Sequence, residues 1–403
     1  MQNIRLNIII SIFAITFIAG FLIGMLFHWG NPYVMVNRSD TFNDFYATLA
    51  VIKDPYSAIG FARGYFPFIY VFLWLFSSLS MQGALILSLV SFIIFFYVSS
   101  YIFLGKKTSM ISPCLVLCSF SYAFIFMLER ANVEIFIYMF IALFVMVYFS
   151  KCKCFSPLVR DILAALFLSF AITTKLYPAV FFVLMVRDKR FRCLILSVLS
   201  SITIGIAGMM AINGTISGLI NNLSWFSDNY DMSLFSMILH DWTHSIFSVI
   251  KSFVMLKVGN ESAVSIIQNI SIFYAVFMLL LFVIISVYVV LYEESNWKTL
   301  YLIIAAMILF PFTSHDYTLA YLFIPMLMFI ISDEVNGKLD IVYSVLFAIP
   351  LCFLNWLQLI PSFTWYHGII IRPSLIVVMM LIIMTQGVKA RRFKEQFLLY
   401  LTK

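Results

Sequence analysis

Ionisable side chains lie within otherwise apolar sequence at five places, and these are the residues with which the chain can do chemistry. Such groups are costly at membrane depth, so they are functional candidates by default. The first place holds three carboxylates, Asp40, Asp44 and Asp54. A carboxylate beside a hydrophobic wall can act as a general base on a hydroxyl group. The alternatives are that these acids are solvated, or that they cap helices, as Asp54 before Pro55 would.

Lys175 is the most informative single residue. It stands between Thr174 and the sequence Leu-Tyr-Pro, inside apolar sequence. The simplest explanation of a lysine at this position is that its side chain extends from a helix end to the membrane surface. An ammonium also binds phosphate as a point charge, so a lipid phosphate at the outer surface is the functional alternative.

The other polar places are junctions between apolar runs. Residues 129–134 include Glu129, Arg130 and Asn132, and an internal Glu–Arg pair there is as good an interpretation as a substrate role. His315 can donate to a phosphate or a sugar hydroxyl, with Asp316 as a possible orienting group. Arg372, directly before Pro373, is a further basic candidate.

Metal and nucleotide chemistry have little support in the sequence. His240 and His244 are one helical turn apart, but the glutamate of the zinc-peptidase pattern is missing and no third ligand is evident. An interfacial amphipathic helix is the preferred interpretation of this segment. Cys152 and Cys154 lack the second ligand pair of a zinc site. There is no phosphate-binding glycine loop and no nucleophile elbow, so we expect no metal and no cofactor.

The elements that position these residues must be transmembrane helices. The chain of 403 residues is 63% apolar and only 11% charged, which places it in the membrane class. The net charge of +7 lies mainly in short loops between apolar runs, so it indicates orientation in the bilayer rather than a nucleic-acid partner. We predict an all-α polytopic protein with about twelve crossings. The predicted spans are 7–27, 82–104, 109–128, 132–150, 158–174, 176–186, 193–213, 264–291, 299–313, 318–331, 341–360 and 369–387.

The basic residues orient this arrangement. Most of the 25 Lys and Arg residues fall in cytoplasmic loops if both termini are cytoplasmic. The basic loops are cytoplasmic only if the 14-residue apolar segment 66–79 does not cross the membrane. We therefore expect this segment to lie in the outer leaflet or to pack against the bundle. The short segment 176–186 forms a hairpin with 158–174, and short helices need protein or water around their ends, which indicates an outward cavity.

The predicted domain organisation is simple. Residues 1–403 form one transmembrane domain, with the catalytic region in the first outer loop, 28–66, and a second large outer loop at 214–263. The six cysteines fall in predicted helices or cytoplasmic loops, so no disulfide framework is expected.

The order of the polar segments resembles the multi-spanning glycosyltransferases of the GT-C fold, and among them the polyprenol-phosphate-mannose-dependent glycosyltransferase family 87. The Asp-aromatic-x-Tyr element of that family is matched at Asp44-Phe45, with Tyr46 displaced by one position. Its later elements resemble 54–56 (Asp-Pro-Tyr), 65–67 (Tyr-Phe-Pro, without the adjacent proline pair), 130–132 (Arg-Ala-Asn) and the basic hairpin 175–192. The resemblance covers most of residues 40–192, and beyond them only His315 offers an anchor.

The resemblance implies an inverting transfer of a hexose or similar sugar from a polyprenyl-phosphate donor on the outer face. Asp44 would be the catalytic base, and a leaving phosphate needs positive charge where its charge develops. The implied phosphate-binding residues are Lys175, His315, Arg130 and Arg372. The implied substrate-binding residues are Asp54, Tyr56, Tyr65, Glu129, Asn132 and Asp316.

The implied partners are a polyprenyl-phosphate sugar, a glycan or glycolipid acceptor of the cell envelope, and the bilayer. A bacterial inner membrane with undecaprenyl phosphate as carrier is the expected setting. Two alternatives stay open: a polymerase that joins lipid-linked repeat units, and a transporter or flippase for lipid-linked sugars. A transporter usually has repeated halves with broken helices, and the sequence has no such symmetry.

Overall fold

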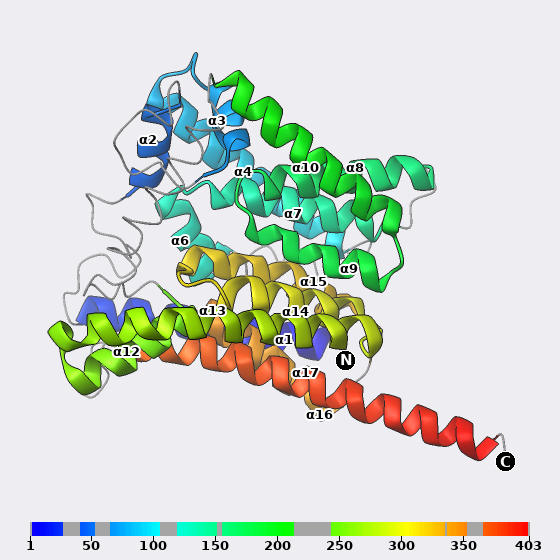
Figure 1. Cartoon of the computed structure of the whole chain (residues 1–403). Helices are drawn as coiled ribbons and strands as arrows, with labels where there is room; N and C mark the ends of the chain where they lie inside the picture. Colours follow the sequence, from blue (N-terminus) through cyan, green and yellow to red (C-terminus); the bar gives the residue numbers. More distant parts are fainter. Residues whose placement is uncertain are drawn as a thin grey trace.

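The computed structural model is helical throughout the part of the chain that it describes (Figure 1). In this part of the chain, Thr243 and His315 form an isolated antiparallel β-bridge. The described residues are 2–26, 41–52, 65–104, 119–150, 155–212, 243–334, 337–352 and 366–401.

Five described helices are long and apolar enough to cross a membrane. An α-helix rises 1.5 Å per residue, so about 20 apolar residues cover the hydrocarbon core. These helices confirm the prediction of an all-α polytopic membrane protein. They are α1 (Gln2–Leu26), α4 (Met81–Leu104), α10 (Phe191–Ala211), α13 (Asn260–Leu291) and α17 (Tyr366–Leu401).

The remaining helices are shorter, and several are buried on every side. All residues of α14 from Thr299 to Leu309 are buried, so this helix is enclosed by protein, which suits a helix too short to meet lipid on its own. The shorter helices of the bundle are α6 (Tyr122–Arg130), α7 (Glu134–Tyr148), α8 (Pro157–Ile172), α9 (Phe182–Arg187), α14 (Asn296–Leu309), α15 (Phe323–Ile331) and α16 (Lys338–Leu351).

The predicted spans coincide with these helices, with differences at their ends. Two spans begin with a 3-10 turn: η1 (Tyr177–Phe181) precedes α9, and η2 (Asp316–Leu322) precedes α15. Pro178 stands in the first turn of η1 and fixes its backbone there. Helix α13 begins four residues before the predicted 264, and α17 continues well beyond 387. Parts of the spans 109–128 and 341–360 lie outside the described residues.

Three short helices lie near one end of the bundle: α2 (Asn43–Ala50), α3 (Pro67–Trp74) and α12 (Ile246–Val258). With eight residues, α3 is too short to cross. It packs closely on α10, since a Cβ added at Gly208 would lie 3.1 Å from the Pro67 Cβ atom. Phe68 also stacks on Phe170 of α8, with ring centroids 4.7 Å apart. Of the two placements expected for segment 66–79, the structure therefore shows the one in which it packs against the bundle.

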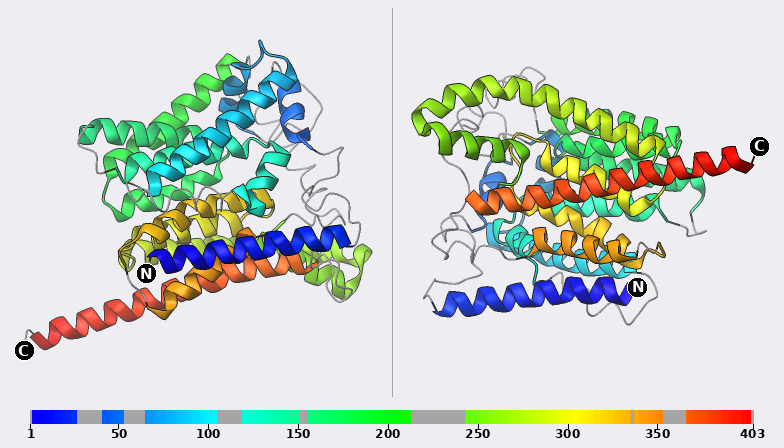
Figure 2. Two further views of the ribbon diagram at one scale, coloured as in Figure 1. Left: turned by 180° about the vertical axis from the view of Figure 1, so that it is seen from behind. Right: turned by 90° about the horizontal axis from the view of Figure 1, so that it is seen from below.

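The helices form two groups with a boundary between them (Figures 1 and 2). One group contains α3, α4 and α7–α10, and the other contains α1 and α12–α17. Helix α6 packs against η2 at this boundary. The functional site described below is built from both groups.

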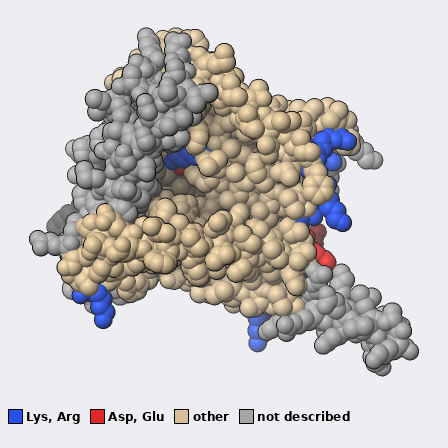
Figure 3. Space-filling view, in the orientation of Figure 1, with Lys and Arg blue, Asp and Glu red and all other residues tan. Residues whose placement is uncertain are grey.

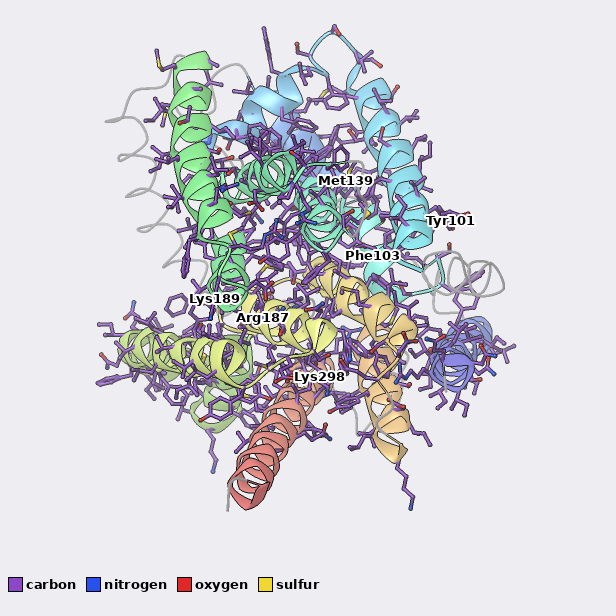
Figure 4. The ribbon with its side chains drawn as sticks, turned by 90° about the vertical axis from the view of Figure 1, so that its right-hand side faces the viewer. Tyr101, Phe103, Met139, Arg187, Lys189 and Lys298 are labelled. Carbon is purple, nitrogen blue, oxygen red and sulfur yellow. The ribbon has the colours of Figure 1, made fainter. Side chains whose placement is uncertain are left out.

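Both termini lie at the same end of the bundle (Figures 1 and 2). Figure 4 looks onto that end, where Arg187, Lys189 and Lys298 lie near one another. Arg5 anchors α1 there: its guanidinium donates to the carbonyls of Phe329 and Ser332, each at 2.8 Å, and to the Asp340 carboxylate at 2.9 Å. Arg5 is 1% exposed, so this bond set fixes α1 to the start of α16.

Candidate active site

Asp44 lies at the end of the bundle opposite the termini, in the first turn of α2. Arg130, the last residue of α6, donates from Nε to Asp44 Oδ2 at 3.1 Å and from Nη2 to Asp44 Oδ1 at 2.5 Å. Asn132 donates to Asp44 Oδ2 at 2.7 Å. The backbone amide of Phe42 donates to the Glu129 carbonyl at 2.9 Å, which ties the start of α2 to the end of α6. We call Asp44, Arg130 and Asn132 the Asp44 cluster.

The turn between α6 and α7 brings these partners together. Helix α6 ends because Ala131 adopts a left-handed conformation with φ of 45°. The Asn132 side-chain carbonyl then accepts from the backbone amide of Glu134, the first residue of α7, at 3.2 Å. The same turn therefore places Arg130 and Asn132 on Asp44 and starts the helix that carries Glu134.

Lys175 forms a second ion pair beside the first. Its ammonium donates to Glu134 Oε1 at 2.6 Å. The hydroxyl groups of Tyr177 and Tyr321 both donate to Glu134 Oε2, and their oxygens are 3.0 Å apart. Glu134 is 1% exposed, whereas Lys175 is 22% exposed. We call Lys175, Glu134, Tyr177 and Tyr321 the Lys175 cluster.

Tyr65 connects the two clusters. Its hydroxyl accepts from the Asn132 amide at 3.4 Å, and the Lys175 ammonium lies 5.1 Å from the centre of its ring. Burial raises the pKa of Tyr65 well above its ordinary value, and the negative charges of Asp44 and Glu134 raise it further. The phenol therefore stays protonated and neutral between the two ion pairs.

His315 approaches the same place from η2. Its ring lies 5.4 Å from that of Tyr317, and the Lys175 ammonium lies 6.0 Å from the centre of the Tyr317 ring. Asp44, Lys175 and His315, which are far apart in the sequence, are thus gathered at one end of the bundle. Figure 3 shows a hollow on this side of the molecule with basic and acidic atoms at its base. Asp44 and Arg130 keep 20% and 17% of their side-chain surface exposed.

Asp316 centres a third group, which is fully buried. Its carboxylate accepts from Tyr122 at 2.5 Å, from Arg372 at 2.5 Å and from His244 Nδ1 at 2.9 Å. The Arg372 guanidinium also lies 3.9 Å from the centre of the Tyr122 ring. We call Asp316, His244, Arg372 and Tyr122 the Asp316 cluster.

His244 is neutral in this setting. Burial lowers its pKa, and the positive charge of Arg372 lowers it further, against the opposing effect of Asp316. With Nδ1 donating to Asp316, its Nε2 accepts from the Ser314 hydroxyl at 3.2 Å, while the Thr318 hydroxyl donates to the His315 carbonyl at 2.9 Å. The carboxylate of Asp316 therefore orients His244, not His315 as the sequence suggested.

A stack of aromatic rings joins the Asp316 cluster to Lys175. Tyr122 stacks on Phe126 with centroids 5.6 Å apart, and Phe126 stacks on Tyr317 at 6.2 Å. Arg372 caps one end of this stack, and Lys175 lies at the other. Arg372 is 2% exposed, so it lies behind the hollow rather than at its surface.

The structure brings together most of the residues that the sequence singled out. Glu129 contributes its backbone carbonyl to the site. Asp40, Asp54, Tyr56 and His240 lie outside the described residues. Sequence reasoning did not assign a role to Glu134, Tyr177, Tyr317 or Tyr321, and it considered His244 only as a metal ligand or part of an interfacial helix. Glu134 and Tyr177 had a usable signal, since each lies within a few residues of a predicted site residue.

The arrangement offers one carboxylate and one ammonium to a ligand. Arg130 and Asn132 occupy three of the four lone-pair positions of the Asp44 carboxylate, so within the described part of the chain Oδ1 keeps one for a proton. Lys175 uses one of its three N–H bonds on Glu134. No group of three or more metal-ligating side chains that could hold an ion occurs among the residues described.

Comparison with known proteins identifies the family. No curated protein and no solved structure matches the chain. The model of glycosyltransferase family 87 matches residues 64–314, which include Tyr65, Arg130 and Lys175 but neither Asp44 nor His315. Because this match covers more than half of the chain, the protein belongs to glycosyltransferase family 87 and is a membrane glycosyltransferase.

Proposed function

We propose that the protein is an inverting glycosyltransferase that moves a sugar from a polyprenyl-phosphate donor to a hydroxyl group of a cell-envelope glycan or glycolipid. The observation that carries this proposal is the juxtaposition of Asp44 and Lys175, which Tyr65 and Asn132 link. A transfer of this kind needs a base for the acceptor and a cation for the leaving phosphate.

Asp44 is the base in this proposal. The acceptor oxygen attacks the anomeric carbon from the side opposite the phosphate, and its proton passes to Asp44 Oδ1, the oxygen with an open lone pair. Arg130 and Asn132 hold the carboxylate in one orientation. We therefore assign Arg130 to the base rather than to the donor phosphate. The proton then passes to water.

Lys175 receives the leaving group. The bond between the anomeric carbon and the phosphate oxygen breaks, and polyprenyl phosphate departs with the electron pair. The two remaining N–H bonds of the Lys175 ammonium stabilise the charge that develops on that oxygen. His315, beside Tyr317, is placed to donate to the same phosphate. Arg372 acts from behind the site, through Asp316.

The arrangement of charges supports the proposed membrane setting. The proposed site lies at the end of the bundle opposite the termini and opposite Arg187, Lys189 and Lys298. We propose that the termini and these basic residues are cytoplasmic, so that the site works at the outer face of the plasma membrane. Donor and acceptor then both arrive from that face, where the lipid carries the sugar.

The test uses purified full-length protein in lipid nanodiscs with an undecaprenyl-phosphate hexose and a set of glycolipid acceptors. We expect release of undecaprenyl phosphate that Asp44→Asn abolishes. Asp333→Asn, at the other end of the bundle beside Gln2, is the matched control and should leave release unchanged. Full release by Asp44→Asn would remove the assignment of the base. Movement of lipid-linked sugar without bond cleavage would indicate a transporter, and activity only with lipid-linked repeat units would indicate a polymerase.

A further inference from the structure

Glu134 is more deeply buried than Asp44, Arg130 and Lys175, the other charged groups of the two ion pairs. It is the first residue of α7, with 1% of its side chain exposed. A helix N-terminus favours a negative charge, but a buried carboxylate still needs close partners to offset the loss of water. The identity of those partners indicates what Glu134 does.

Three side chains from two segments converge on Glu134. Lys175 and Tyr177 lie in the turn after α8, where Tyr177 begins η1. Tyr321 belongs to η2 and is 187 residues from Glu134 along the chain. The bonds to Tyr177 and Lys175 hold the turn after α8 against α7. The bond to Tyr321 crosses the boundary between the two groups of helices. Glu134 therefore sets where the Lys175 ammonium lies relative to both groups.

Lys175 is correspondingly constrained. One N–H bond points to Glu134 at 2.6 Å, and the ammonium lies between the rings of Tyr65 and Tyr317, at 5.1 and 6.0 Å from their centres. A free lysine side chain has many rotamers, and fixing it before the ligand arrives avoids that entropy loss during catalysis. A cation between two aromatic rings is also favoured electrostatically.

We propose that Glu134 is a positioning residue for the leaving phosphate: it holds the Lys175 ammonium where the donor phosphate binds, and touches neither sugar nor phosphate itself. This inference rests on the proposed function. Glu134 is distinct from the base, because three donors already surround its carboxylate and it is nearly inaccessible, whereas Asp44 is 20% exposed and keeps an open lone pair.

A double-mutant cycle tests the proposal, because a residue that acts only through Lys175 has no effect once Lys175 is gone. Glu134→Gln should lower kcat about tenfold or more, the size typical of losing a residue that orients a functional group. Lys175→Ala should lower it about a hundredfold. The double variant should be no slower than Lys175→Ala alone. If the two losses multiply, Glu134 acts independently of Lys175 and the proposal is wrong.

Glu293→Gln is the matched control. Glu293 is also a buried glutamate that accepts from a tyrosine, Tyr288 at 3.1 Å, but it lies beyond the end of α13, away from the site. The same substitution there should leave kcat unchanged. A loss equal to that of Glu134→Gln would mean that removing any buried carboxylate slows the enzyme, and would contradict a specific role for Glu134.

Binding of the product gives a readout that does not depend on turnover. Short-chain polyprenyl phosphate is titrated into nanodiscs that contain the protein. The affinity of Glu134→Gln for this product should be about tenfold lower than that of the wild type. The double variant should bind it no more weakly than Lys175→Ala does. If Glu134 had only a structural role, Glu134→Gln would lower thermal stability, but its loss of affinity would not depend on Lys175. If Glu134→Gln does not fold, Glu134→Asp keeps the charge but shortens the side chain, and the same coupling to Lys175→Ala is expected.

The outcomes also separate this inference from the proposed function. If wild-type protein neither binds polyprenyl phosphate nor releases it from any donor, the proposed function fails, and the inference fails with it. If wild-type protein does both, but Glu134→Gln or Glu134→Asp binds and turns over as well as wild type, the inference alone is overturned.

Discussion

Arg130 holds Asp44 with two N–H bonds, one to each carboxylate oxygen, although 86 residues separate them in sequence. This fork geometry is specific to arginine, because its planar guanidinium matches a carboxylate in a way that an ammonium does not. The pair fixes the plane of the carboxylate, and Asn132 fixes its remaining freedom. In the proposed mechanism this is what directs one oxygen of Asp44 to the acceptor.

Substituting Arg130 by lysine should therefore slow the reaction while preserving the charge. We expect Arg130→Lys to lower kcat about tenfold or more, since a point charge cannot hold both oxygens. Steady-state kinetics with the donor and acceptor measure this, and Arg192→Lys at the other end of the bundle is the control. Wild-type kcat in Arg130→Lys would show that the orientation of Asp44 does not limit the rate.

Tyr65 should act through its ring more than through its hydroxyl. The hydroxyl bond to Asn132 is long, at 3.4 Å, while the ring lies beside the Lys175 ammonium. A cation–π contact contributes about 0.5–2 kcal/mol, or roughly 2- to 30-fold. Tyr65→Phe should then retain most of the activity, whereas Tyr65→Leu should be slower than the wild type by a factor in that range. Equal losses in both variants would assign the effect to the hydroxyl instead.

The helical framework was largely predictable from sequence, whereas the pairing of charges was not. Long apolar runs define the spans because each must cross the same hydrocarbon thickness. Polar residues within them, such as Lys175 and Arg130, were recognisable because burial makes them costly. The sequence could not show that Lys175 pairs with Glu134 and Arg130 with Asp44, since that choice depends on how α2, α6, α7 and α8 pack in space.

His244 illustrates the same limit. In sequence it stands one turn from His240, a spacing that allows a metal site but that we interpreted as part of an interfacial helix. Its actual partner, Asp316, is 72 residues away on another segment. Tyr321 likewise carries no local signal, because a tyrosine in an apolar run looks like any other core aromatic side chain.

Folding stability should depend on pH through His244. Burial holds its pKa below the ordinary value of 6.5, so the unfolded chain takes up a proton at a pH where the folded protein does not. The stabilisation is complete above about pH 6.5 and is lost below it, by up to about 1.4 kcal/mol per pH unit. Two charged groups face His244: Arg372 lowers its pKa further, and Asp316 raises it. The pKa remains below its ordinary value, so stability still falls as the pH is lowered.

Thermal unfolding of wild type and His244→Asn between pH 5 and 8 measures this effect. The wild-type protein should lose stability below about pH 6.5 more steeply than His244→Asn, which has no proton to gain. A steeper loss in the variant, or parallel curves, would show that His244 is not held neutral by the fold.

Arg5 should matter for stability rather than for chemistry. Arg5 is 1% exposed, and its guanidinium bonds the carbonyl groups of Phe329, Ser332 and Glu334 and the Asp340 carboxylate, far from the proposed site. Arg5→Ala leaves Asp340 buried without its charged partner, which should cost roughly 3–5 kcal/mol. Thermal unfolding in detergent measures the loss, with the exposed Lys338→Ala as control. Unchanged stability in Arg5→Ala would show that the pair contributes nothing to the fold.

The assignment of Asp44 as base and Lys175 as phosphate ligand is tested most directly by replacing the acceptor hydroxyl with azide, a nucleophile that has no proton to lose. Asp44→Ala should be inactive with the natural acceptor but should form the inverted glycosyl azide from polyprenyl-phosphate sugar at close to the wild-type rate. Lys175→Ala should be slow with both nucleophiles, because the phosphate must still leave. A product of retained configuration, or failure of azide to rescue Asp44→Ala while wild type forms the glycosyl azide, would contradict the account.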